Sequence, residues 1–373
     1  MRVGLLGTGR IGSFHARTLA HHPAVAELLV ADTDPASARA TAQRLAGAPA
    51  AVTALDRVDG VDAVLASGLD AVVIATATDA HADLIARAAR AGLPAYCEKP
   101  IAMDLAGTLR ALREVERHGT ALQLGFQRRF DAGYNAARAA LRSGALGFVH
   151  TIRAVTADPA PPPAAYVPTS GGLFRDCSVH DFDIVRWVTG REVTRVYATG
   201  SNRGASFFAE AGDVDTAAAL LTLDDGTLVS CNATRYNGAG YDVRMELAGS
   251  KDQLTVGLGP RAPMTSAEPG APGAPADPWP DFLSRFHDAY LAELDAFLDV
   301  ARGLVPSPCT GRDALEALLI AEACELSRRL GAPVELDTVR TTALTALTAP
   351  GEPGEPAAPV AAAPAPVTQE RAR

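Results

Sequence analysis

The chain has 373 residues, of which 75 are alanine and 32 are arginine, but only Lys99 and Lys251 are lysines. Hydrophobic residues make up 48% of it, so a chain of this length can bury the cores of about two domains. The net charge of −9 and the lack of a basic cluster exclude a typical nucleic-acid surface. No apolar run is long enough to span a membrane, and the apolar start at 1–6 is too short for a secretory signal.

The five cysteines are odd in number, widely scattered and free of C-x-x-C spacing. This pattern predicts neither a disulfide framework nor a zinc site, and we expect no bound metal. A reducing compartment fits such cysteines, so we expect a cytoplasmic protein.

Up to about residue 125, short apolar runs alternate with stretches that have helical spacing and good helix-forming residues. Strand followed by helix, repeated, predicts parallel pairing in a doubly wound α/β sheet. We therefore expect residues 1–125 to form one Rossmann-type domain. The expected strands are 2–6, 26–31, 71–75, 94–97 and 121–126, and the expected helices are 11–20, 35–45, 80–91 and 105–118.

From about residue 148 the strands become longer, and Asp224-Asp225-Gly226 between two of them is a hairpin signal. This change predicts a second domain at 126–340, of α+β type with a largely antiparallel open sheet. A Pro/Gly/Ala-rich insert at 257–280 is expected to be a surface loop, and 348–373 a disordered Ala/Pro-rich tail. The expected strands are 148–155, 193–201, 214–223, 227–232 and 241–248, and the expected helices are 134–143, about 178–188, 281–300 and 313–330.

The segment Gly7-Thr8-Gly9-Arg10-Ile11-Gly12 follows the first expected strand and opens the first expected helix. In such a turn the first glycine permits the tight bend, the second admits a pyrophosphate, and the third lets helix and strand pack closely. Free N–H groups at the helix N-terminus favour the anion. Asp32 ends the next strand 20 residues after Gly12, where a carboxylate binds a ribose diol. The spacing predicts a dinucleotide site, with Gly7, Gly9, Arg10, Ile11, Gly12 and Asp32 as cofactor contacts.

Asp32 also predicts NAD rather than NADP as the cofactor. A carboxylate accepts hydrogen bonds from a 2′-hydroxyl but repels a 2′-phosphate. Arg10 and Arg39 are nearby cations that could tolerate a phosphate.

The strand expected at 71–75 ends in the small residues Ala75 and Thr76, which let a cofactor pass at the carboxyl end of a central strand. We expect both to contact the cofactor. His81 follows at the start of a helix and either lines the nicotinamide site or has a capping or packing role.

Glu98-Lys99-Pro100 comes directly after the strand expected at 94–97, at the crevice edge of the sheet. Pro100 disfavours helical geometry at Lys99. An ammonium beside a nicotinamide could orient a hydroxyl and stabilise an alkoxide, a role in which arginine is not equivalent. The scarcity of lysine favours this role over the alternative, a surface lysine paired with Glu98. Glu98 and Lys99 are therefore expected cofactor contacts, and Lys99 also an expected substrate contact.

A second cluster lies at 171–183, where Asp176, His180 and Asp183 have the spacing i, i+4 and i+7. A helix that begins near Asp176 would place them on one face. A carboxylate beside an imidazole can hold and tune a general base, so His180 is the expected acceptor of a hydroxyl proton. The alternatives are binding of a divalent metal by these side chains and capping of the helix by Asp176.

Together, the glycine turn, Glu98-Lys99-Pro100 and the G-G-x-F-x-D-x-x-x-H-D-x-D pattern at 171–183 resemble the glucose-fructose oxidoreductase/inositol dehydrogenase/rhizopine catabolism (Gfo/Idh/MocA) family of NAD(P)-dependent oxidoreductases. The resemblance spans about residues 1–335. Within the family, the segments at 125–131 and 158–162 are most similar to the inositol 2-dehydrogenases.

The resemblance implies a catalytic trio of Lys99, Asp176 and His180, with His180 as the acid/base and the other two binding the reacting hydroxyl. It also implies that Arg129, Asp158 and Tyr241 line a polyol pocket. Ala157, Ala165 and Pro168 depart from the family's usual polar residues, which leaves the exact polyol open because such sites discriminate through the hydroxyls they pair.

The expected function is therefore NAD-dependent oxidation of a cyclic polyol, foremost myo-inositol, to the ketone by a homotetramer, with no nucleic-acid or membrane partner. One alternative is a dehydrogenase or reductase for another cyclitol or sugar, such as scyllo-inositol or an aldose. A second is a regulatory protein that senses NAD without turnover, which would be expected to lack Lys99 or His180. A third, a glycosidase that uses NAD transiently, would need metal ligands that this chain does not visibly assemble.

Overall fold

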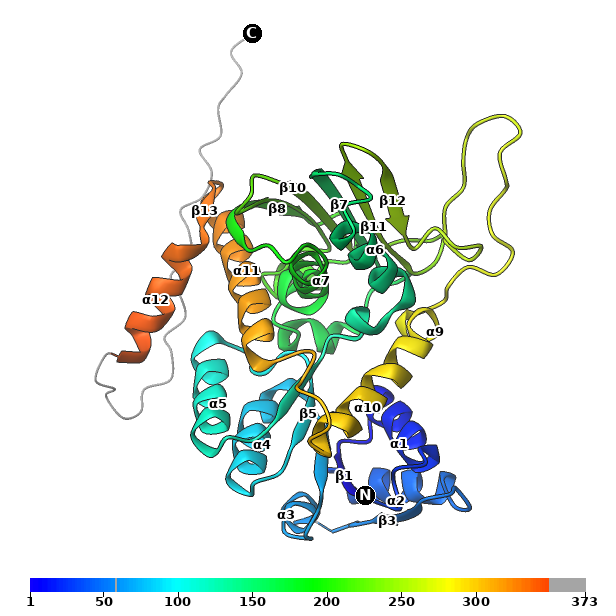
Figure 1. Ribbon diagram of the computed structural model, residues 1–373, viewed down its shortest axis with the longest axis vertical. Coiled ribbons are helices and arrows are strands. Elements are labelled where there is room, and N and C mark those ends of the chain that lie inside the picture. The colour runs from blue at the N-terminus through cyan, green and yellow to red at the C-terminus, as the bar shows by residue number, and fades with distance from the viewer. Residues whose placement is uncertain (58, 349–373) are drawn as a thin grey trace.

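The computed structural model describes residues 1–57 and 59–348, and its first half contains a six-stranded parallel sheet with the order β3-β2-β1-β4-β5-β6. Helices connect successive strands and lie on both faces, in the lower part of Figure 1. This confirms the expected α/β fold. The strands are β1 (Arg2–Leu6), β2 (Glu27–Ala31), β3 (Ala51–Ala54), β4 (Ala71–Ile74), β5 (Ala95–Glu98) and β6 (Leu122–Gly125), and the helices are α1 (Arg10–His21), α2 (Pro35–Arg44), α3 (Gly60–Leu65), α4 (Thr78–Arg90) and α5 (Leu105–His118).

The strand β3, of four residues, and the helix α3, of six residues, were not expected. Both are too short to show a clear hydrophobic period. The strand order reverses between β1 and β4, and a ligand of an open α/β sheet binds at such a switch point, beyond the carboxyl ends of the strands. The glycine turn follows β1 at this point.

The second sheet has seven strands in the order β12-β11-β7-β10-β9-β8-β13. All pairs are antiparallel except β7 with β10, so the sheet is mixed but largely antiparallel. The Asp224-Asp225-Gly226 turn joins β9 to β10 as expected, whereas β12 and β13 were not expected. The strands are β7 (Val149–Ala157), β8 (Val193–Ser201), β9 (Thr216–Leu223), β10 (Leu228–Thr234), β11 (Asp242–Gly249), β12 (Gln253–Val256) and β13 (Val334–Glu335).

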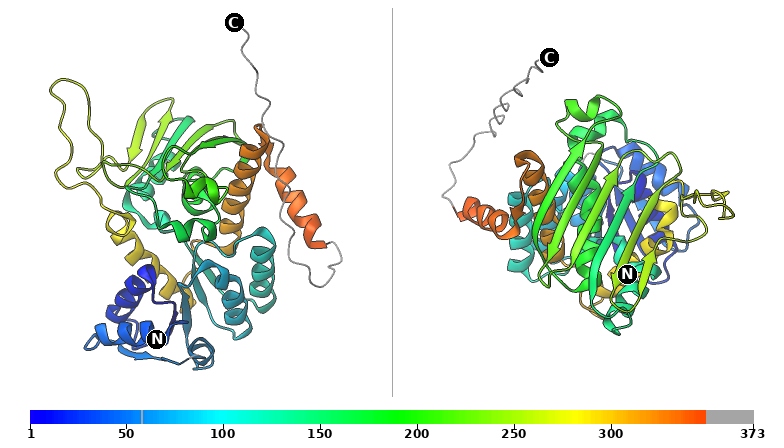
Figure 2. Two further views of the ribbon diagram at one scale, coloured as in Figure 1. Left: turned by 180° about the vertical axis from the view of Figure 1, so that it is seen from behind. Right: turned by 90° about the horizontal axis from the view of Figure 1, so that it is seen from above.

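Helices cover one face of this sheet, and the other face is open in the right-hand view of Figure 2. The helical elements of this half are η1 (Gln127–Phe130), α6 (Ala132–Arg142), η2 (Ala164–Thr169), η3 (Phe174–Ser178), α7 (Val179–Thr189), α8 (Phe207–Glu210), α9 (Phe282–Arg285), α10 (His287–Ala301), α11 (Gly311–Leu330) and α12 (Leu336–Thr348).

The chain after the second sheet returns to the first. The expected helix at 281–300 is two helices, α9 and α10, because the chain bends at Phe286. Leu294, Phe297 and Leu298 of α10 are buried in one cluster with side chains of β1, β2 and β4. This packing fixes the second half of the chain against the first sheet. We use the word crevice for the region between the carboxyl ends of β1, β4 and β5 and the segment formed by η3 and α7.

The insert at 257–280 forms no helix or strand and extends from the body as a long loop (Figure 1). The expected tail at 348–373 lies outside the described residues apart from Thr348, which ends α12. Within the part that the structure describes, no helix is both long and apolar enough to cross a membrane.

Candidate active site

The glycine turn has the geometry that a pyrophosphate requires. Gly7 has a φ of +92°, and a Cβ atom there would lie 2.4 Å from the Ala75 carbonyl oxygen. A Cβ atom on Gly12 would lie 2.1 Å from the Gly7 carbonyl oxygen, so both positions need glycine. Gly9, in contrast, faces open space, and no side chain caps the N-terminus of α1 there. The free N–H groups and this space fit the diphosphate of NAD.

Asp32 is fixed at the end of β2 by the same turn. Its Oδ2 atom accepts hydrogen bonds from the Thr8 backbone N–H at 2.6 Å and from the Thr8 hydroxyl at 2.8 Å. Burial raises the pKa of this carboxyl, but hydrogen bonds from the Asp34 and Thr8 backbones outweigh it and lower the pKa. Asp32 is therefore a fixed negative charge where a ribose diol would lie.

The two cations near this point are occupied elsewhere. The Arg39 guanidinium pairs with Asp56 at 2.6 Å, and that of Arg10 stacks on the Phe282 ring at 4.6 Å. Neither guanidinium pairs with Asp32, so the negative charge that opposes a 2′-phosphate is not neutralised by these arginines. This supports the expected preference for NAD.

His81 connects two loops rather than pointing at open space. One ring nitrogen lies 2.7 Å from the Pro100 carbonyl oxygen and the other 3.1 Å from the Thr76 carbonyl oxygen, and the side chain is buried. These contacts favour the packing alternative. They tie the end of β4 to the segment that carries Lys99.

The Glu98 carboxylate contacts side chains of α1 and β5 rather than Lys99. Its Oε1 atom lies 2.7 Å from the His15 ring nitrogen Nε2 and accepts a hydrogen bond from the Tyr96 hydroxyl at 3.0 Å. Burial raises the pKa of Glu98, but the contact with His15 outweighs it and lowers the pKa. The alternative of a surface lysine paired with Glu98 is therefore not what the structure shows.

Lys99 instead reaches across the crevice to Asp176. Its Nζ atom donates to the Asp176 carbonyl oxygen at 2.7 Å and to the carboxylate Oδ1 atom at 3.1 Å. The Lys99 side chain is only 16% exposed. The end of β5 in the parallel sheet thus supplies the cation, and η3 in the second half of the chain supplies its carboxylate partner.

Asp176 lies in η3, a π-helical turn that leads into α7. Turns of this kind are rare and are often found at functional sites. Burial raises the pKa of the Asp176 carboxyl, but the charges of Lys99 and Arg235 and their hydrogen bonds outweigh it and hold the pKa well below its usual range. Asp176 is therefore an ionised acceptor.

His180 follows one turn later and stands edge-on to the Phe126 ring, with 5.7 Å between ring centroids. Within the described residues, its buried Nδ1 atom has no hydrogen-bond partner. Burial lowers the pKa of His180 well below its usual value, the charges of Lys99 and Arg128 lower it further, and Asp176 opposes them. The imidazole is neutral at physiological pH and can accept a proton.

The structure corrects two details of the expected cluster. The Asp176 carboxylate contacts Lys99 rather than the imidazole, and Asp183 does not join the pair. Asp183 is fully buried and binds the Arg129 guanidinium, with distances of 2.8 Å and 2.5 Å. A buried carboxylate needs such a counter-charge.

Arg129, an expected polyol contact, is buried and has its guanidinium engaged by protein groups. Besides Asp183, its guanidinium donates to the Pro308 carbonyl oxygen and lies 3.2 Å from Asp313. The neighbouring Arg128 is the arginine whose charge reaches His180 and Tyr241.

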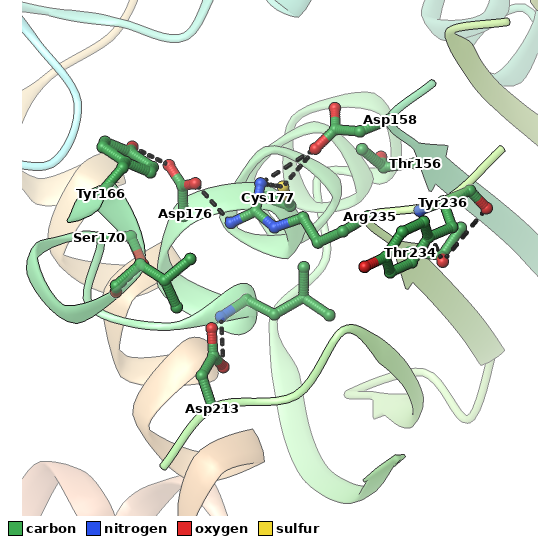
Figure 3. A network of polar contacts seen from close by, with 12 residues as sticks. Thr156, Asp158, Tyr166, Ser170, Asp176, Cys177, Asp213, Thr234, Arg235 and Tyr236 are labelled. Atoms are coloured by element: carbon green, nitrogen blue, oxygen red, sulfur yellow. Dashed lines mark hydrogen bonds and ion pairs between the residues drawn. The ribbon is translucent and has the colours of Figure 1, made fainter. Parts of the chain in front are cut away.

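Two functional candidates were missed, Arg235 and Tyr166, which both contact Asp176 (Figure 3). Arg235 also binds Asp158, one of the expected polyol contacts. Tyr241 is buried, and the charges of Asp158 and Arg128 act on its hydroxyl. No motif marked Arg235 or Tyr166, and the only sequence signal was their place just after a strand and after the prolines at 161–163.

Family models match both halves of the chain. The NAD-binding Rossmann fold of the GFO/IDH/MocA oxidoreductase family matches residues 1–126, and the GFO/IDH/MocA C-terminal domain matches residues 134–255. The chain therefore belongs to the GFO/IDH/MocA family of oxidoreductases. Its cofactor is NAD, which the turn and Asp32 described above would hold.

Individual relatives narrow the comparison. Myo-inositol dehydrogenase Hyg17 of Streptomyces leeuwenhoekii is 39% identical over 89% of this chain and 98% of the relative. Inositol 2-dehydrogenase of Rhizobium meliloti is 37% identical over 87% of this chain and 95% of the relative. The crystal structure of a Lactobacillus casei scyllo-inositol dehydrogenase with bound NAD(H) and scyllo-inositol superposes with a TM-score of 0.78, with 30% identity over 90% of this chain and 99% of that one.

Proposed function

We propose that this protein is an NAD-dependent dehydrogenase that oxidises a secondary hydroxyl group of a cyclic polyol, with myo-inositol as the favoured substrate and 2-keto-myo-inositol (scyllo-inosose) as the product. One observation carries the proposal. Lys99, an ionised Asp176 and a neutral His180 lie together beyond the carboxyl end of β5, in the same sheet whose strand β1 leads into the glycine turn, and we place the nicotinamide beside them. The inositol dehydrogenases to which the chain is similar support the choice of substrate.

Each of these three side chains has a separate role in the proposed reaction. When bound, NAD supplies the acceptor for the hydride that leaves the hydroxyl-bearing carbon. His180 takes the hydroxyl proton, because its imidazole is neutral before the reaction. Lys99 donates to the substrate oxygen as negative charge develops on it, and Asp176 holds the ammonium in place. The ketone forms as the C–H and O–H bonds break.

Further contacts of the cofactor and the polyol follow from their positions. We assign Gly7, Gly9, Arg10, Ile11, Gly12, Asp32, Ala75, Thr76 and Glu98 to the cofactor side. On the polyol side we assign Asp158, which shares Arg235 with Asp176, and Tyr241, on whose hydroxyl the charge of Asp158 acts. The contacts of Arg129 favour a structural role for that residue.

The test is a screen for NADH and NADPH formation over the inositol isomers and aldoses, with NAD and NADP in parallel. We expect the highest kcat/KM with myo-inositol and NAD. Preference for scyllo-inositol would move the assignment to the alternative that the Lactobacillus casei structure represents. No turnover of any polyol, together with measurable NAD binding, would refute the proposal and favour a sensing protein.

We further propose that residues 1–125 are the cofactor domain and that residues 126–340 bind the polyol and form a homotetramer. The open face of the second sheet supports an assembly surface, because exposed apolar side chains lie on neighbouring strands there and such patches mark interaction sites. Light scattering in solution tests the proposed mass. The exposed apolar side chains on or beside these strands are Phe148, Tyr197, Leu220 and Leu228.

A cytoplasmic location is also proposed. All five cysteines are free and buried, with no disulfide between them. Free thiols of this kind fit a reducing compartment. Cell fractionation with an antibody to the native protein would test it.

A further inference from the structure

Arg235 is a buried arginine that contacts three groups of the crevice at once. It follows the last residue of β10, and its side chain is only 5% exposed. The guanidinium donates to Asp158 at 3.0 Å, to Asp176 at 2.6 Å and to the Cys177 sulfur at 2.8 Å (Figure 3). The proposed reaction does not by itself require this residue.

The contacts with the two carboxylates have the same form. In each of Asp158 and Asp176, the guanidinium binds the Oδ2 atom. The Oδ1 atom of Asp176 remains for Lys99 and for the Tyr166 hydroxyl, which donates to it at 3.0 Å. Within the described residues, the Oδ1 atom of Asp158 has no hydrogen bond. One guanidinium therefore fixes the orientation of two acceptors.

The arrangement also solves an electrostatic problem. Two carboxylates that share one site repel each other, and burial penalises both charges. A planar guanidinium with its donors in a fixed fork can bind both carboxylates, whereas an ammonium is a single point charge. Among the described residues, Arg235 is thus the cation that pairs with both carboxylates, while Lys99 pairs with Asp176.

We propose that Arg235 is a positioning residue that holds Asp158 and Asp176 side by side, so that each acts on a different hydroxyl group of one polyol. Asp176 holds the Lys99 ammonium at the reacting hydroxyl. Asp158 accepts a hydrogen bond from a neighbouring hydroxyl. The inference rests on the proposed function and adds a selectivity for substrates that carry adjacent hydroxyl groups.

The experiment compares myo-inositol with its deoxy analogue that lacks one hydroxyl next to the reacting carbon. Wild type, Arg235→Gln and Arg235→Lys are assayed with both compounds, and NAD binding is measured for each protein. Arg186→Gln is the matched control, since Arg186 is a similarly buried arginine that binds Glu192 through two nitrogens, away from Asp176.

For Arg235→Gln we expect the KM for myo-inositol to rise about tenfold to a hundredfold, the range for a lost hydrogen bond to a charged group, with a smaller fall in kcat. The KM for the deoxy analogue should rise much less, so the ratio of kcat/KM for myo-inositol to that for the analogue should decrease. Arg235→Lys should lie between wild type and Arg235→Gln, while NAD binding and the control stay unchanged.

Two results would overturn the inference while wild type is active. One is near-normal kinetics of Arg235→Gln, and the other is an equal loss with both compounds, which is what a purely structural role predicts. If Arg235→Gln does not fold, Arg235→Lys with wild-type discrimination overturns it as well. A wild-type protein that oxidises no polyol refutes the proposed function itself.

Discussion

The two sides of the crevice are built from different interactions. On the cofactor side, glycines and backbone N–H groups shape the space, and Asp32 is held mainly by the Thr8 and Asp34 backbones. On the polyol side, Lys99, Asp176 and Arg235 are charged groups in direct contact. Changes on the cofactor side should therefore alter which cofactor binds, whereas changes on the polyol side should stop the chemistry.

The largest effect is expected at His180, where the two sides meet. Replacement by alanine removes the proton acceptor and should lower kcat with myo-inositol by roughly 10²- to 10⁴-fold. NAD binding should change little, because the glycine turn does not depend on this ring. Steady-state kinetics and NAD titration check both statements, with His118→Ala on α5 as the control. Near-normal turnover by His180→Ala would refute the assigned role.

Lys99→Arg is the substitution on the polyol side with the second largest expected effect on turnover. It keeps the positive charge but replaces a compact donor with a larger planar one that does not fit the same contacts. We expect kcat to fall by roughly 10²- to 10³-fold, as for the loss of a donor that stabilises a developing oxyanion.

Lys251→Arg is the matched control, since it changes the only other lysine of the chain, which is exposed. It should leave turnover unchanged. If Lys99→Arg behaved like Lys251→Arg, only the charge of Lys99 would matter, and the scarcity of lysine would have no bearing on the site.

The same difference between the two sides explains what the sequence could predict. The glycine turn, Asp32 and Lys99 each follow a strand of the parallel sheet, and the carboxyl ends of such strands meet at one edge. Their location at the same edge of the sheet therefore follows from parallel strand pairing. The helix after Asp176 was also predictable from spacing.

The network around Asp176 was not predictable in this way. Arg235 and Asp158 are 77 residues apart, and they meet because β10 pairs in parallel with β7, with Thr234 opposite Ala157. A hairpin signal does not predict a parallel pair, and Asp176 joins this contact from a different element, η3. The π-helical turn at 174–178 has no sequence period of its own. The contact of Arg129 with Asp183 was also not predictable, because the sequence does not say which carboxylate a guanidinium will bind.

On the cofactor side, Asp32→Asn should change preference rather than rate. The amide keeps an acceptor for the Thr8 backbone but removes the charge that opposes a 2′-phosphate. The ratio of kcat/KM for NADP to that for NAD should rise by about a hundredfold, because a like-charge contact costs several kcal/mol. Asp56→Asn is an informative comparison, as it frees Arg39 while leaving Asp32 in place. An unchanged ratio in Asp32→Asn would contradict the assigned role.

The smallest expected effect is on the pH dependence of kcat/KM, which depends on the pKa of His180. Burial and the charges of Lys99 and Arg128 lower the pKa of the imidazole, so the neutral base persists as the pH falls. From about pH 7.5 to about pH 6, kcat/KM for myo-inositol should fall less than about twofold, whereas an imidazole with a pKa of about 6.5 would lose about fourfold. Because kcat/KM reports groups of the free enzyme, an acid limb at or above the ordinary histidine pKa would mean that His180 is not desolvated before substrate binds, and that Lys99 does not act on it across the crevice.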